Sequence, residues 1–182
     1  MSRQEQRRSS WSAVKAAISD LERDALVALV RDLYDLSPDN KHFVHARLGP
    51  RQDALAGYKK IVAECMYPDA DRDVQITNAK KAISEYRKAA SDAAGEIDLM
   101  IYFVECGNRF TLEYGDIDER FYDALLSMYA RSVEAVARLP GLEQKRFRQR
   151  LWELTKSSDG IGWGYHDGLC DKYYSAFPHT DA

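Results

Sequence analysis

Apolar residues recur at helical spacing along almost the whole of this 182-residue chain. Between residues 20 and 36, for example, four of them fall at positions i, i+3, i+4 and i+7, which is the pattern of a helix with one apolar side. These residues are Leu26, Leu29, Val30 and Leu33. Alternation of apolar and polar residues, the mark of a strand, is limited to residues 74–76. The sequence therefore predicts an all-α protein.

Prolines, glycines and capping residues divide this pattern into about nine helices. Ser37 followed by Pro38 marks one clear start, because serine accepts hydrogen bonds from the first turn and proline fits its first position. We expect helices near residues 10–19, 20–36, 38–48, 51–65, 77–89, 91–114, 116–139, 142–156 and 165–177. The expected caps of the first, fifth and sixth are Ser10 or Ser12, Thr77 or Asn78, and Ser91. Short connections predict antiparallel hairpins, arranged as a compact bundle or a short solenoid-like stack.

The length of the chain fits one domain. We expect a disordered tail at residues 1–9 and a single helical domain over residues 10–182. The expected helix near residues 92–114 is the most apolar, which predicts that it is central to the core and buries Met100 and Phe103. Gly107 within it costs about 1 kcal/mol relative to alanine. A close helix crossing at that position is one reason to keep a glycine there.

Composition and motifs argue against several classes of protein. A net charge of −3 lacks the basic footprint of a nucleic-acid-binding chain. The three cysteines form no CxxC pair, which argues against a disulfide framework or a thiolate zinc site and favours a reducing, cytoplasmic compartment. No apolar run approaches the roughly 20 residues of a membrane span, and the N-terminal segment lacks the apolar core of a secretory signal. Familiar nucleotide-binding and hydrolase motifs are absent.

Three acidic residues crowd the start of one expected helix, namely Asp116, Asp118 and Glu119. Carboxylates at this spacing can bind a hard cation such as Mg²⁺ or Ca²⁺ through oxygen. The simpler interpretation is that Asp116 or Asp118 caps the helix while the other acids favour its dipole.

A glycine-rich segment, residues 157–168, precedes the last expected helix and contains Trp163 and Tyr165. Glycine permits a left-handed backbone or the close approach of a ligand, and a glycine-rich turn before a helix can hold an anion. Alternatively, the segment is a tight turn that packs Trp163 into the core. We leave open whether it is a binding loop or a structural turn.

His166 and Asp167 follow directly in the same region. If they lie near Asp116 and Asp118, a pocket with acid–base or metal-binding chemistry becomes possible, with Trp163 and Tyr165 as its walls. The candidate metal ligands are then Asp116, Asp118 and His166. The alternative is that His166 is a structural residue that forms hydrogen bonds in the first turn of the helix.

Basic residues cluster in the segment 145–150 (KRFRQR) and in the N-terminal tail. A solvated helix face is the simplest interpretation of the first cluster. Weak association with nucleic acid is the alternative, but the acidic middle of the chain makes it a minor one.

Four segments resemble a bacterial all-helical family that is catalogued only as a domain of unknown function. The two most characteristic contain EYGDIDERFY, within residues 113–129, and GIGWGYHD, within residues 160–174. The sequences of residues 21–48 and 78–89 also resemble that family. The resemblance implies an intracellular helical protein, and it brings no established activity or catalytic residues.

From these observations we expect a non-catalytic, cytoplasmic protein-interaction or regulatory module whose partner is another protein. We expect no cofactor, no membrane and no substantial binding to nucleic acid. The alternative function is a metal-binding protein or enzyme that uses a divalent metal at Asp116, Asp118 and His166.

Overall fold

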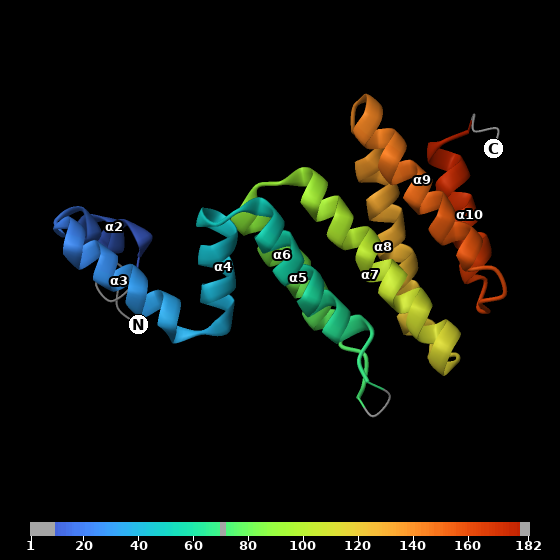
Figure 1. Cartoon of the computed structure of the whole chain (residues 1–182), viewed down its shortest axis with the longest axis horizontal. Helices are drawn as coiled ribbons and strands as arrows, with labels where there is room; N and C mark the ends of the chain where they lie inside the picture. Colours follow the sequence, from blue (N-terminus) through green and yellow to red (C-terminus); the bar gives the residue numbers. More distant parts are fainter. Residues whose placement is uncertain (1–9, 70–71, 179–182) are drawn as a thin grey trace. The chain divides into compact units, whose positions relative to one another are not determined.

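A computed structural model describes residues 10–69 and 72–178 of the chain, and over these residues its regular secondary structure is helical. Nine helices and no strand are found there, so the all-α prediction is confirmed (Figure 1). The helices are α2 (Trp11–Ser19), α3 (Arg23–Leu36), α4 (Pro38–Leu48), α5 (Arg51–Met66), α6 (Ile76–Ala90), α7 (Ala93–Tyr114), α8 (Glu119–Ala137), α9 (Gly141–Ser157) and α10 (Tyr165–Ala176). The expected disorder of residues 1–9 lies outside the described residues.

Two of the expected helix caps are confirmed and two are wrong. Ser10 accepts from the backbone N–H of Ala13, and Ser37 accepts from that of Asn40 at 3.1 Å. Helix α6, however, begins at Ile76, so neither Thr77 nor Asn78 caps it.

At the start of α7 the cap is Asp92 rather than Ser91. The side chain of Asp92 accepts from the backbone N–H of Gly95 at 3.1 Å. Ser91 instead ends α6 with a left-handed backbone, at a φ of 50°. A carboxylate favours the positive end of the helix dipole, which explains why aspartate takes the capping position.

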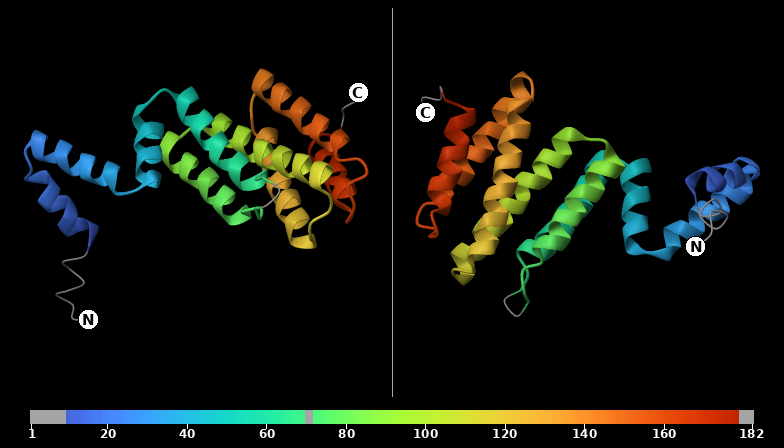
Figure 2. Two further views of the ribbon diagram at one scale, coloured as in Figure 1. Left: turned by 60° about the horizontal axis from the view of Figure 1, so that its bottom comes forward. Right: turned by 180° about the vertical axis from the view of Figure 1, so that it is seen from behind.

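Contacts divide the chain into two units, Met1–Val44 and His45–Ala182, with the boundary inside α4. The single domain expected over residues 10–182 stays a prediction. In the first unit, α2 and α3 diverge from the turn between them (Figure 2), and neither helix buries a residue.

The second unit is a helical bundle organised around α7, which contacts α5, α6, α8 and α9. Successive helices from α7 to α10 run in opposite directions (Figure 1). Met100 and Phe103 of α7 are buried, as the apolar pattern predicts. Gly107 faces Leu125 of α8, and a methyl carbon at this position would collide with the leucine side chain. The expected close crossing at Gly107 is therefore confirmed.

Over the described ranges, no helix combines the length and the hydrophobicity that crossing a membrane requires.

Candidate functional site

The turn between α7 and α8 is held by a tyrosine of α8. The hydroxyl of Tyr122 donates to Oδ1 of Asp116 at 2.7 Å and also contacts the hydroxyl of Thr111 on α7. Thr111 in turn donates to the carbonyl of Gly115 at 3.1 Å. Asp116 is therefore tied into the turn through one of its two carboxylate oxygens.

The glycine-rich segment lies against this turn. A methyl carbon built on Gly162 would stand 3.8 Å from Oδ2 of Asp116. The ring of Tyr165, the first residue of α10, packs against the ring of Tyr122 with centroids 5.4 Å apart. The fold thus brings together two turns that are more than 40 residues apart in the sequence.

Asp118 and Glu119 lie at the same end of α8 but have a local role. The side chain of Asp118 accepts from the backbone N–H of Phe121 at 2.8 Å, and Glu119 occupies the first turn of the helix. The capping interpretation is confirmed for Asp118. Both residues are exposed.

His166 is held within its own segment by two contacts. Its Nδ1 lies 2.9 Å from the hydroxyl oxygen of Ser158, and its Nε2 lies 3.6 Å from Sγ of Cys170. Burial, reinforced by Asp167, raises the pKa of the Cys170 thiol, so this Cys–His pair lacks the depressed pKa of an activated nucleophile. These contacts are the hydrogen bonds that the structural interpretation of His166 expects, and its role stays a prediction.

The proposed ligand set for a metal is not formed. Within the described residues, no group of three or more His, Cys, Asp or Glu side chains gathers where it could hold a metal ion. The three expected ligands have separate partners: Asp116 bonds to Tyr122, Asp118 caps α8, and His166 faces Ser158 and Cys170.

Trp163 does not pack into the core, so that expectation is wrong. Its side chain is 61% exposed, whereas Ile161 and Tyr165 on either side of it are buried. Trp163 and Gly164 both have a left-handed backbone, at φ 62° and 66°. The turn that these angles produce buries its flanking residues instead.

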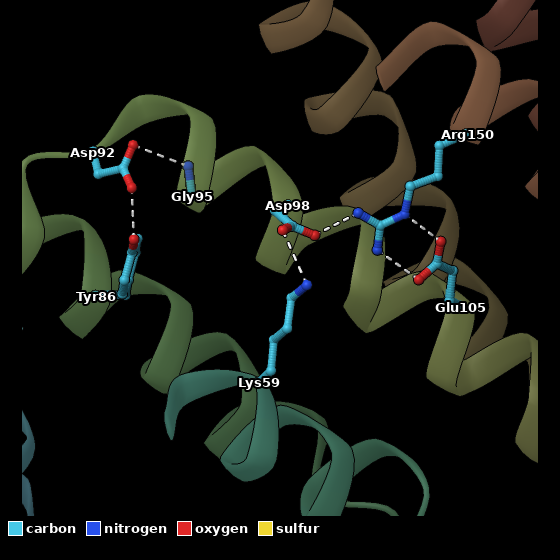
Figure 3. Close-up of polar contacts among 7 residues, drawn as sticks. All are labelled: Lys59, Tyr86, Asp92, Gly95, Asp98, Glu105 and Arg150. Carbon is cyan, nitrogen blue, oxygen red and sulfur yellow. Dashed lines mark hydrogen bonds and ion pairs between the residues drawn. The ribbon is translucent and has the colours of Figure 1, made fainter. Parts of the chain in front are cut away.

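A network of charged side chains that the sequence analysis does not identify joins three helices (Figure 3). Arg150 of α9 contacts both carboxylate oxygens of Glu105 on α7, at 2.5 and 2.6 Å, and also binds Asp98. Lys59 of α5 reaches the other oxygen of Asp98 at 3.0 Å. Asp98 is only 6% exposed.

The charges in this network stabilise one another. Burial alone would raise the pKa of Asp98, but Arg150 and Lys59 outweigh burial and hold this pKa below its ordinary value. Burial would likewise lower the pKa of Arg150, but Glu105 and Asp98 hold it above its ordinary value. The interpretation of residues 145–150 as a solvated face is therefore wrong for Arg150. One signal in the sequence could have indicated the network: Asp98 and Glu105 lie seven residues apart, on one side of the most apolar helix.

Beside this network, a pocket of about 450 Å³ opens between α7 and α9. Arg150 and Glu105 form part of its wall, together with Asn108 and Arg109 of α7. The pocket combines ligand-sized space with a buried polar side chain, Asn108.

Comparisons with protein-family models, with curated proteins and with solved structures give no match for this chain. The class of this protein, all-α, rests on its helices alone. The resemblance to a bacterial helical family stays a prediction.

Proposed function

We propose that this chain is a non-catalytic, cytoplasmic protein-interaction module that acts through the apolar side of α2 and α3. We infer further that this side binds the same side of a second copy of the chain. The apolar side is defined here by Trp11 and Val14 of α2 and by Leu29, Val30, Leu33 and Leu36 of α3.

The observation that carries this proposal is the exposure of these residues. Leu36 is 75% exposed, Trp11 71%, Leu33 50% and Val30 48%. On α3 they share a side, whereas the ion pair of Arg31 with Asp35, at 3.9 Å, lies on the opposite side. Exposed apolar residues that share one side of a helix are typical of an interaction site.

Helix stability gives a second argument. Helices shorter than about 12–15 residues are marginal in water without tertiary packing. Helices α2 and α3 have 9 and 14 residues and bury none of them. A covering surface would supply the packing that each helix lacks, and each half-exposed leucine or valine that it buries would contribute about 1 kcal/mol.

A second copy is the occupant that best fits this surface. In a two-fold symmetric dimer the same surface of both copies lies in the interface, so one contact buries the apolar residues of each copy. Amphipathic helices bury their apolar sides by packing against other amphipathic helices, and α3 of a second copy presents such a side to α3.

Sedimentation-velocity measurements on the full chain test this proposal. We expect a dimer at about 100 µM that dissociates on dilution. Val30→Lys and Leu33→Lys each place a charge on the apolar side and should give a monomer. Ala28→Lys adds the same charge on the opposite side of α3, where Asp24 and Asp32 are its helical neighbours, and should leave the dimer intact. A monomeric parent protein, or a dimer that survives both substitutions, would contradict the proposal.

A further inference from the structure

His166 and Cys170 direct two metal-binding atoms at one another across one turn of α10. They are four residues apart, which places their side chains on the same side of the helix. Nε2 of His166 lies 3.6 Å from Sγ of Cys170. Both residues keep part of their surface exposed. An imidazole nitrogen and a thiol sulfur are therefore adjacent near the surface of the second unit.

Hydrogen bonds on the far side of the ring decide which nitrogen of His166 carries the proton. Oγ of Ser158 lies 2.9 Å from Nδ1 of His166 and 2.7 Å from the backbone carbonyl oxygen of Thr155. Because a carbonyl oxygen only accepts, the single hydroxyl proton of Ser158 is directed to Thr155, and Oγ accepts from Nδ1 of His166. Nε2 is then the unprotonated nitrogen, and its lone pair faces the sulfur of Cys170.

This arrangement is the one that metal-binding histidines use. Such a histidine donates its other ring N–H to a nearby oxygen, which fixes the tautomer and the orientation of the ring. Ser158 is fully buried and holds Nδ1 of His166 in this way. The position of Nε2 is therefore set by the end of α9 before any ion binds.

The type and number of these ligands select the ion. A thiolate is a soft ligand that favours Cu(I), and an imidazole also suits copper. Within the described ranges, no third His, Cys, Asp or Glu joins the pair to complete a metal-holding group. A tetrahedral zinc site needs more ligands than this, whereas Cu(I) is stable with two ligands on opposite sides of the ion. Rotation of the two side chains would open the pair enough to admit it.

The charges around the sulfur also favour a cation. Burial raises the pKa of the Cys170 thiol, and the negative charges of Asp167, Asp171 and Asp159 raise it further. The thiol therefore keeps its proton at neutral pH in the metal-free protein. The same carboxylates favour a positive ion that replaces this proton.

We propose that His166 and Cys170 bind one Cu(I) ion, with Nε2 and Sγ as its two ligands. The thiol proton is released to water as the copper–sulfur bond forms. The ion stays Cu(I) throughout, so the step consumes no oxidant or reductant. This site is independent of the association through α2 and α3.

Anaerobic titration of the reduced full chain with Cu(I) in dilute acetonitrile tests the proposal. Long-range ¹H–¹⁵N NMR reports on the two ring nitrogens of His166 separately. We expect a saturable shift of Nε2, while Nδ1 stays protonated through its bond to Ser158. This measurement needs no variant. An Nε2 resonance that does not respond to Cu(I) would overturn the proposal.

Two substitutions separate this site from binding at the other thiols. Cys170→Ser should abolish the response of Nε2. His166→Gln should weaken Cu(I) binding at least about tenfold, the loss usual even when only the partner of a ligand is removed. His45→Gln changes an exposed histidine of α4 and should leave Cu(I) binding unchanged. Competition with a chromophoric Cu(I) chelator measures these affinities. Equal affinity of Cys170→Ser, His166→Gln and the parent protein would also overturn the proposal.

Discussion

Arg150 Nε and Nη2 lie 2.5 and 2.6 Å from the two carboxylate oxygens of Glu105, a bidentate contact that joins α9 to α7. The same guanidinium also binds Asp98, which Lys59 of α5 holds from the other side. Three helices therefore depend on one set of charges that is largely removed from water.

Replacement of Arg150 by methionine should destabilise the protein by about 3 kcal/mol. Methionine keeps most of the apolar stem but leaves Glu105 without its partner and Asp98 with Lys59 alone. Arg146→Met, at an exposed position of the same helix, should cost less than about 0.5 kcal/mol. Urea unfolding monitored by circular dichroism measures both, and equal midpoints for the two variants would contradict the role given to Arg150.

The lowered pKa of Asp98 predicts a specific loss of stability in acid. Because the folded state holds this carboxyl below its ordinary pKa of 3.8, the unfolded state binds its proton more readily. The stabilisation is fully present above that ordinary value and is lost as pH falls through the folded-state pKa. The difference in unfolding free energy between the parent protein and Asp98→Asn should therefore shrink as the pH falls below about 4. A difference that is constant from neutral pH to about pH 2 would argue against this linkage.

Gly95 is required by the close approach of Tyr86 and Asp92. The hydroxyl of Tyr86 donates to Oδ2 of Asp92 at 2.8 Å, and a methyl carbon on Gly95 would collide with both groups (Figure 3). Gly95→Ala should therefore destabilise the protein by about 1–3 kcal/mol, although alanine is the better helix former.

Gly57 of α5 provides the matched control for Gly95. Among the described residues, apart from its chain neighbours and the backbone of its own helix, no group lies within 4 Å of a methyl carbon built there. Gly57→Ala should stabilise the protein by about 0.5–1 kcal/mol through helix propensity alone. Thermal melting of the two variants gives opposite shifts if the contacts of Gly95 are as described, and shifts of the same sign if they are not.

Trp163 and Tyr165 should differ sharply in their importance for stability. Tyr165 is buried and donates to Asn108, so Tyr165→Ala should cost about 3–5 kcal/mol. Trp163 is 61% exposed, and Trp163→Ala should cost less than about 1 kcal/mol. Chemical denaturation of the two variants checks this order, and a larger loss for the tryptophan variant would place its side chain in the core after all.

The sequence alone determined the helical class of this protein and most of its helix positions. The spacing of apolar residues is a local property of each helix. The helix starts at Ser10, Ser37 and Asp118 are also local, because each of these side chains accepts from the backbone N–H three residues further on. The burial of Phe103 followed from the same spacing. The spacing does not choose between the adjacent Ser91 and Asp92 as the cap of α7, and the left-handed backbone of Ser91 decides between them.

Only the tertiary structure decided which polar groups meet. Asp98 and Arg150 are 52 residues apart, and Asn108 and Tyr165 are 57 apart, so no local pattern pairs them. The exposure of Trp163 likewise depends on backbone angles that the composition of a glycine-rich turn does not fix. Side chains brought together by helix packing owe their contacts to the whole bundle, and for this reason the charged network and the pocket beside it emerged only from the structure.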